Sequence, residues 1–166
     1  MVIKFDKIIN NKEELKKFDR TNPYMVAALL VHTFTNYKLD DNNNFYEMLQ
    51  FLLGECQPLS EMTKQNIRDR MLQNNKYLFI GISYFKGATN LNDYKPNIPY
   101  EIEVFDDEYS LDADGYKRLF LQSGGADSKR PIMLRLSKDG NYYIWSDSFI
   151  GLLADIKEIE SENPWQ

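Results

Sequence analysis

The chain has 166 residues, of which 43% are hydrophobic and 14% aromatic, and its formal net charge is −5. This composition excludes a disordered chain, and the length suits one domain with a core of its own. Cys56 is the single cysteine, which excludes an intrachain disulfide framework and is typical of a reducing compartment, so we expect a cytoplasmic protein. No stretch has the length and hydrophobicity of a membrane span, and residues 1–17 lack the pattern of a signal peptide.

The negative charge is concentrated in the second half of the chain. Residues 1–76 carry 11 basic and 10 acidic side chains, whereas residues 77–166 carry 9 and 15. A domain of this sign is repelled by phosphate backbones unless basic side chains cluster locally, and only Lys117-Arg118 with Lys129-Arg130 could form such a cluster. We therefore expect no nucleic-acid partner.

The first part of the chain carries helix signals. Residues 1–21 are predicted to be an N-terminal extension with one short helix, capped by Asn10 or Asn11. Asn22-Pro23 is a typical helix start, because asparagine caps free N–H groups and proline fits the first helical position. Residues 24–37 are apolar almost all round, which predicts a central helix that is buried on most sides.

Two further helices are predicted downstream. The first covers residues 45–53 and ends at Gly54, a residue suited to the left-handed conformation that follows many helices. The second covers residues 61–72 and ends at Asn74-Asn75. Its expected buried side chains are Met62, Ile67 and Met71.

Strand signals dominate the second part of the chain. Residues 77–84 are a β-leaning apolar run, for which a short helix fits almost as well. Strict alternation predicts strands over residues 100–105 and 116–122, the first with Ile102 and Val104 facing inward.

Asp139-Gly140 predicts a hairpin between two more strands, because a two-residue turn of this composition suits the positive φ values that a tight hairpin needs. Closing the turn there would pair Lys138 with Asn141. Leu134 would then lie opposite Trp145, with both side chains on the same face of the sheet.

Helices followed by strands predict an α+β fold. We expect one domain over residues 1–166, with N-terminal helices packed on a C-terminal, mainly antiparallel sheet of four to five strands. A cone-like arrangement, as in the nuclear-transport-factor-like superfamily, is an architectural analogy for this order and implies no function. Residues 157–166 are a polar, acidic tail.

The loop over residues 123–131 contains two adjacent glycines and is a candidate binding site. Backbone N–H groups around such glycines can form a nest for an anion, with added charge from basic side chains. The simpler interpretation, which we favour, is a glycine-bearing hairpin loop in which Asp127 and Ser128 make local turn bonds. The candidate binding residues are Ser123, Gly124, Gly125, Asp127, Lys129 and Arg130.

The loop over residues 86–99 is a second candidate, because it is the longest stretch without periodicity and loops of this length are often functional. With Tyr84, Tyr94 and Tyr100, it could offer a stacking and hydrogen-bonding surface to a peptide or a sugar. Aromatic residues also favour strands, so ordinary sheet packing explains these tyrosines more simply.

Patterns that indicate catalysis or metal binding are missing from the sequence. His32 is the only histidine and is predicted to be a packed helix residue; without a second histidine or cysteine the usual zinc ligands are lacking. The acidic residues between Asp106 and Asp114 lack the distal glutamate of a calcium loop and suit a solvated turn. We expect no cofactor and no metal, and nothing in the sequence positively indicates an enzyme.

Three strings in the sequence are distinctive: NPYMVAA from Asn22, SYFKGAT from Ser83 and SGGADS-x-RP from Ser123. With them, the chain resembles a bacterial domain family that is classified as a domain of unknown function. The resemblance extends over most of the chain, from about Asn22 onward. It implies no activity, cofactor or site residue.

We expect a non-catalytic, cytoplasmic binding module that recognises a protein partner through the loops 86–99 and 123–131. One alternative is a small-ligand pocket protein or an enzyme with a cone-shaped sheet, using Asp127, Tyr116 or His32 as the polar group in an apolar cavity. Another is a structural subunit of an assembly, which would expose a large apolar patch. The residues indicate neither the identity of the partner nor the oligomeric state.

Overall fold

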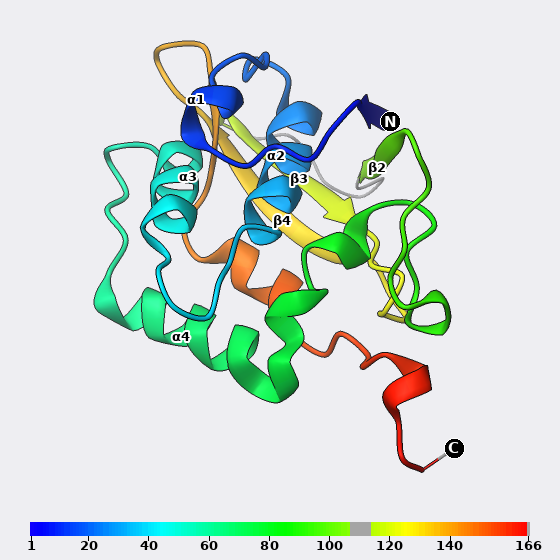
Figure 1. The fold of residues 1–166 in the computed structure, drawn as a ribbon. Coiled ribbons are helices and arrows are strands. Elements are labelled where there is room, and N and C mark those ends of the chain that lie inside the picture. Colours follow the sequence, from blue (N-terminus) through cyan, green and yellow to red (C-terminus); the bar gives the residue numbers. More distant parts are fainter. Residues whose placement is uncertain (107–113, 166) are drawn as a thin grey trace.

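The computed structural model describes residues 1–106 and 114–165. Over these residues it has an α+β fold in which helices pack on a curled, five-stranded antiparallel sheet, a half-barrel with strand order β1-β2-β3-β4-β5 (Figure 1). The predicted fold class is therefore confirmed. The strands are β1 (Val2–Phe5), β2 (Tyr100–Asp106), β3 (Tyr116–Leu121), β4 (Arg130–Leu136) and β5 (Tyr142–Ile144). The helices are α1 (Lys12–Leu15), α2 (Pro23–Phe34), α3 (Asn43–Leu53) and α4 (Glu61–Leu72), with short 3-10 helices η1 (Gln73–Leu78), η2 (Ile82–Tyr84), η3 (Asn90–Asn92), η4 (Ser148–Leu153) and η5 (Glu160–Glu162).

Capping side chains define the helix starts. Asn22 Oδ1 accepts a hydrogen bond from the Tyr24 N–H (3.0 Å), and Ser60 Oγ accepts one from the Thr63 N–H (3.1 Å). The predicted helices are present, although α2 ends at Phe34 instead of at residue 37 and α3 begins at Asn43 instead of at residue 45. None of the helices in the described ranges has the length and apolar character that crossing a membrane requires.

Helix α2 forms the centre of the core. Every side chain from Val26 to Phe34 is buried. The helix contacts β2, β3 and β5, where Ile102 and Val104 face it as predicted and are fully buried (Figure 1). Packed side chains of the helix and the strands therefore fill the inner side of the curled sheet.

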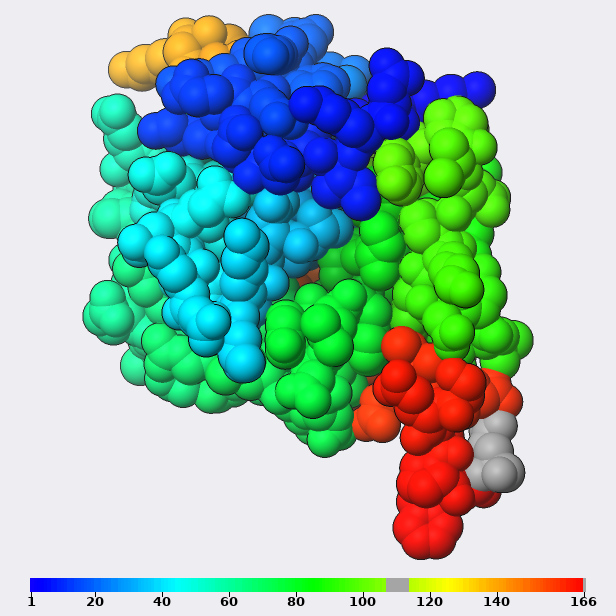
Figure 2. Space-filling model, viewed as in Figure 1, coloured from blue at the N-terminus to red at the C-terminus, as the bar shows by residue number. Residues whose placement is uncertain are grey.

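The N-terminal extension contributes an edge strand, β1, that was not predicted. Ile3 pairs with Ile102 and Phe5 pairs with Tyr100. Ile3 and Phe5 are buried and their neighbours in the strand are exposed, which is the alternation of a strand with one face on a core. Figure 2 shows the N-terminal segment (blue) lying against the body of the molecule and the C-terminal tail (red) projecting from it.

The predicted register of the β4–β5 hairpin is wrong by one residue. Leu134 pairs with Ile144, and Arg135 pairs with Tyr143. Because successive strand residues face opposite sides of a sheet, this shift places Ile144 in the core and puts Tyr143 and Trp145 on the outer face, opposite to Leu134.

The length of the turn causes the shift. Ser137 N–H donates to Asn141 O (2.9 Å), so the loop contains the three residues 138–140 instead of the two expected. Gly140 has a φ of 86°, the left-handed conformation at the end of a three-residue hairpin loop. The Asp139-Gly140 pair thus identified the hairpin correctly and its loop length incorrectly.

Two of the three side chains predicted to be buried on α4, Ile67 and Met71, are buried, and the prediction is wrong for Met62. Met62 is 76% exposed, whereas Thr63, Ile67 and Met71 are buried. The three buried positions are spaced four residues apart and therefore lie along one side of the helix. The Thr63 hydroxyl, the polar member of this face, donates to Asp147 (3.2 Å).

Residues 77–84 comprise the end of η1, a turn over residues 79–81 and η2, so the strand interpretation is wrong and short helical structure takes its place. Ile80 N–H donates to Lys76 O (2.9 Å) and Ser83 N–H donates to Phe79 O (2.9 Å). Phe79 and Ile80 are consecutive and both buried, an arrangement that a strand with one core face does not allow.

Candidate functional site

The loop 123–131 uses its polar groups inside the fold. Ser123 Oγ donates to Ser83 Oγ (2.7 Å) and accepts a hydrogen bond from the Gly125 N–H (3.0 Å). The Gly124 N–H donates to Ser83 O (2.8 Å). An anion nest needs backbone N–H groups that are free to face a ligand, and both glycine N–H groups here are already paired.

The two glycines allow the loops 123–131 and 86–99 to pack against each other. A β-carbon on Gly124 would lie 1.8 Å from Ala88 O, and one on Gly125 would lie 2.1 Å from the Tyr94 hydroxyl oxygen. Only glycine fits such close approaches. The structure therefore brings the two predicted loops together, as a packing contact between them.

Tyr84 and Tyr94 are buried instead of forming an exposed surface. The Tyr84 hydroxyl donates to Leu152 O, and the Tyr94 hydroxyl donates to Lys157 O. Burial raises the pKa of Tyr94 to about 12 and also raises the pKa of Tyr84. Both tyrosines tie the loop region to the segment that follows β5.

The charged members of the loop 123–131 also have partners. Asp127 forms an exposed ion pair with Lys157 (2.7 Å), and the hydrogen bond from that lysine lowers the pKa of Asp127. Arg130 donates to two carbonyl oxygens at the end of η4 (2.9 and 2.6 Å). Lys129 lies over the ring of Phe105, with its Nζ 3.9 Å from the centroid. The acidic turn expected between Asp106 and Asp114 lies mostly outside the described residues.

His32 is a core residue, as predicted. Its Nδ1 accepts a hydrogen bond from the Ile9 N–H (3.0 Å), and the rings of Phe5 and Phe85 lie 4.2 and 5.1 Å from the imidazole. Its buried Nε2 has no hydrogen-bond partner within the described part of the chain. Burial lowers the pKa of His32 to about 3, so the imidazole is neutral at physiological pH.

We predict that His32 makes the protein less stable in mild acid. Below pH 6.5 the imidazole of the unfolded chain gains a proton, whereas that of the folded chain stays neutral down to about pH 3. The free energy of unfolding is therefore unaffected by titration of His32 above pH 6.5 and falls progressively between pH 6.5 and pH 3. At pH 5 the free energy of unfolding should be about 2 kcal/mol lower than at pH 8. Urea unfolding at a series of pH values measures this.

A His32→Asn variant is the control for this prediction, because its amide oxygen can still accept the Ile9 N–H bond but does not titrate. His32 is the only histidine, so the variant should show a much flatter dependence between pH 8 and pH 5. Equal slopes for the two proteins would contradict the prediction.

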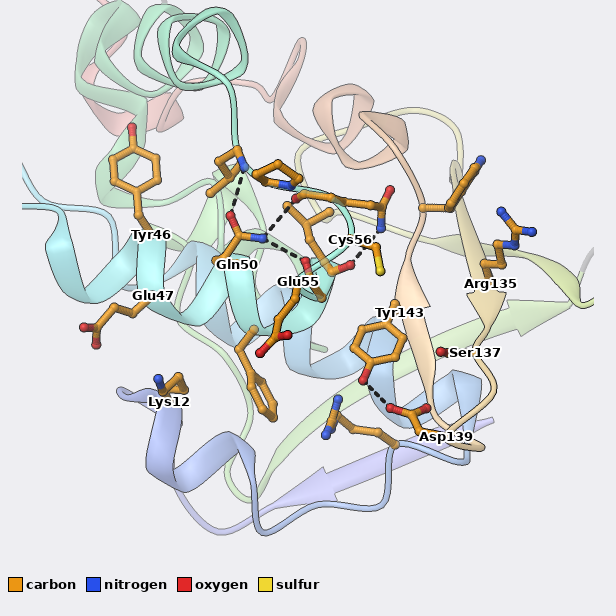
Figure 3. A pocket seen from close by; sticks show the side chains of 18 of the residues that line it. Lys12, Tyr46, Glu47, Gln50, Glu55, Cys56, Arg135, Ser137, Asp139 and Tyr143 are labelled. Carbon is orange, nitrogen blue, oxygen red and sulfur yellow. Dashed lines mark hydrogen bonds between the residues drawn. The ribbon is translucent and has the colours of Figure 1, made fainter.

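An open cleft of about 1280 Å³ lies on a different part of the molecule, between α3, the α3–α4 loop and the β4–β5 hairpin (Figure 3). Its walls come from segments that are far apart in the sequence. The aromatic residues that line it are Tyr46, Phe51, Tyr143 and Trp145, and the charged residues are Lys12, Arg20, Glu47, Glu55, Lys64, Arg135, Lys138 and Asp139.

Two glutamines hold the α3–α4 loop in place beside the hairpin. The Gln50 side chain donates to two carbonyl oxygens of the loop (both 2.9 Å) and accepts from the Leu59 N–H (2.9 Å). Gln57, within the loop, donates to Ile144 O (2.8 Å) and accepts from the Ser146 N–H (2.7 Å). These bonds fix the floor of the cleft without using its aromatic or charged side chains (Figure 3).

Each aromatic ring of the cleft has a basic side chain beside it. Such cation–π contacts are worth about 0.5–1 kcal/mol at exposed sites and restrict the motion of the basic group. The contacts are Arg20 with Phe51 (4.2 Å) and Tyr143 (5.4 Å), Arg135 with Trp145 (4.6 Å) and with Tyr116 outside the cleft (4.9 Å), and Lys64 with Tyr46 (5.0 Å).

Tyr143 and Asp139 are hydrogen-bonded to each other within the cleft. The Tyr143 hydroxyl donates to Asp139 Oδ2 (2.6 Å), and this bond lowers the pKa of Asp139, which keeps the carboxylate ionised (Figure 3). Efficient acid–base catalysis requires a pKa close to the working pH, and this one is shifted away from it. Within the described residues, no group of three or more His, Cys, Asp or Glu side chains is arranged to hold a metal ion.

None of the residues predicted to bind a ligand lines this cleft. Phe51 interrupts the polar side of α3, and Tyr143 and Trp145 alternate with the buried Ile144. A correct hairpin register would therefore have identified one wall. Arg20 precedes the cap of α2, and no local pattern in the sequence assigns it to the cleft.

The cleft lies entirely within the part of the chain that is shared with a family. No curated protein and no solved structure matches the chain. A family model described as a domain of unknown function, DUF6935, matches residues 7–160, which include helices α1–α4 and strands β2–β5. The chain therefore belongs to the DUF6935 family of domains of unknown function.

Proposed function

We propose that this domain is a non-catalytic binding module that recognises a segment of a partner protein in the cleft between α3 and the β4–β5 hairpin. The observation that carries the proposal is an open cleft of about 1280 Å³ lined by paired aromatic and basic side chains. Small-molecule pockets have volumes of roughly 300–1,000 Å³, and tyrosine, tryptophan and arginine are the residues enriched where proteins bind one another.

A partner that docks in the cleft is favoured over a ligand inside the sheet. Side chains of α2 fill the inner side of the half-barrel. The polar groups considered for an internal pocket are also separated, because His32 is in the core, Asp127 is exposed and Tyr116 packs with Trp145. The loops 86–99 and 123–131 pack on each other, which moves the proposed recognition site away from them.

We further propose that the module works in the cytoplasm. The chain has one cysteine, Cys56, and its thiol is free and exposed at the edge of the cleft. Free exposed thiols persist in reducing compartments and become oxidised or paired elsewhere.

Chemical blocking of the cleft tests the binding site. Peptides would be selected from a displayed random library on the unmodified protein, and their affinity would then be measured after coupling a bulky maleimide to Cys56. We expect affinity to fall by at least about tenfold, since the added group occupies the cleft. The matched control carries Cys56→Ser with Ser128→Cys and the same label in the loop 123–131; it should bind as the unmodified protein does.

Two outcomes count against the site. One is unchanged binding after labelling at Cys56. The other is loss of binding only when the label is attached at position 128, which would return the site to the loop 123–131.

A further inference from the structure

We infer that the segment recognised in the cleft is acidic and that its carboxylates pair with Arg20 and Arg135. This inference rests on the proposed binding function and names the chemistry of the partner. The inference is based on three observations. They are the charge of the cleft, the lack of carboxylate ion pairs to the two guanidinium groups among the described residues, and the position of these groups beside Tyr143.

The charge of the cleft is opposite to that of the whole protein. The chain carries a net charge of −5, and the acidic excess is in residues 77–166. Basic groups nevertheless outnumber carboxylates along the cleft. The basic residues are Lys12, Arg20, Lys64, Arg135 and Lys138, and the acidic residues are Glu47, Glu55 and Asp139. A local field of this sign attracts a negatively charged partner.

Among the described residues, Arg20 and Arg135 are not neutralised by ion pairs, although the charge of Arg20 adds to the hydrogen bond from Tyr143 in lowering the pKa of the nearby Asp139. Neither guanidinium forms an ion pair with a carboxylate within the residues that the structure describes. Aromatic rings hold both groups, Phe51 for the first and Trp145 for the second. An arginine held over an aromatic ring keeps its in-plane N–H groups for a bidentate bond with a carboxylate, and less side-chain entropy is lost when that bond forms.

The two arginines lie on either side of one tyrosine. Arg135 is the direct neighbour of Tyr143 across β4 and β5, and Arg20 lies 5.4 Å from the centroid of the same ring. An extended peptide places side chains of one face about 7 Å apart. We expect acidic residues on the face of the bound segment that contacts the two arginines, with an apolar or aromatic residue available to contact Phe51.

Nucleic acid is a weaker candidate for the same cleft. Its phosphates form a continuous line of negative charge, which would pass the carboxylates of Glu47, Glu55 and Asp139. A peptide can donate hydrogen bonds to these three carboxylates from its backbone N–H groups, or form ion pairs with them through basic side chains. Among the described residues, the two arginines of the cleft form no ion pair with a carboxylate, and three carboxylates lie in the same cleft. This arrangement suits a segment that is acidic at its centre and carries other polar groups around it.

The residue preferences of displayed peptides test the inference. Peptides selected on the full chain should share acidic residues, and their affinity should fall when salt is raised from about 0.05 M to about 0.5 M. Arg20→Met and Arg135→Met should each weaken a selected acidic peptide by about tenfold. The control Arg68→Met removes an exposed arginine of α4 that does not line the cleft and should leave affinity unchanged.

The other possible results of these binding experiments distinguish failure of the acidic specificity from failure of the binding site itself. Selection of neutral or basic peptides that the Cys56 label blocks would overturn the acidic specificity and leave the proposed binding function standing. Tighter, label-sensitive binding of an oligothymidylate probe would also overturn the acidic peptide. Absence of any peptide that the label blocks would contradict both proposals. Circular dichroism of the arginine variants separates lost binding from lost folding.

Discussion

Replacing Gly124 with alanine is expected to lower the free energy of unfolding by about 4 kcal/mol. The new β-carbon would lie 1.8 Å from Ala88 O and 2.9 Å from the carbonyl carbon of that residue. These are backbone atoms, so no rotation of a flexible side chain relieves the clash. Separating the loops would also break the hydrogen bond from Gly124 N–H to the backbone oxygen of the buried residue Ser83.

Gly151→Ala is the matched control for this substitution. A β-carbon at Gly151 meets no atom within 4 Å, and the residue does not require a positive φ. Its effect on unfolding should stay within about 0.5 kcal/mol. Chemical denaturation of both variants measures the difference; a Gly124→Ala protein as stable as the control would show that the loops 86–99 and 123–131 are not packed as described.

Replacing Met71 with alanine is expected to cost about 2–5 kcal/mol of unfolding free energy. Met71 is fully buried on the inner face of α4, so its removal leaves a cavity. The size of the loss depends on how far the neighbouring side chains can collapse into that space. Thermal or urea unfolding gives the value.

Met62→Ala is the same chemical change on the same helix at a position that is 76% exposed. It should alter the free energy of unfolding by no more than about 0.5 kcal/mol. The pair therefore tests the orientation of α4, because the sequence pattern alone treated the two methionines as equivalent. Equal losses at both positions would contradict the orientation found in the structure.

The parts of the fold that depend on local chemistry could be predicted from the sequence. The start of α2 is determined by the Asn22 side chain and by Pro23 beside it. The end of α3 is determined by Gly54, whose φ of 84° favours glycine. Such signals act over a few residues, so a single sequence contains them in full.

The register of the β4–β5 hairpin shows where this reasoning stops. Asp139-Gly140 is compatible with a two-residue loop and with a three-residue loop that ends on Gly140, and the two differ by one residue. The packing decides between them, since only the longer loop buries Ile144 opposite Leu134. The outward position of the half-buried Tyr143 and Trp145, which form one wall of the cleft, follows from that choice.

The candidate site was beyond sequence reasoning for a related physical reason. Arg20, Phe51 and Tyr143 come from three segments that local signals treat separately, and only tertiary packing brings them together. The loop 123–131 was predicted as a site from its composition, and its glycines and Ser123 take part in close packing. Glycine-rich strings mark tight backbone contacts, and a ligand is only one of the partners that can make them.

Mapping a bound peptide on the protein tests the central claim most directly. Backbone amide chemical shifts would be recorded while a selected acidic peptide is added to the isotope-labelled chain. We predict that the changes centre on the amides of Phe51, Gly54 and Tyr143 around the cleft. Changes confined to residues 86–99 and 123–131, with the amides around the cleft unmoved, would contradict the account.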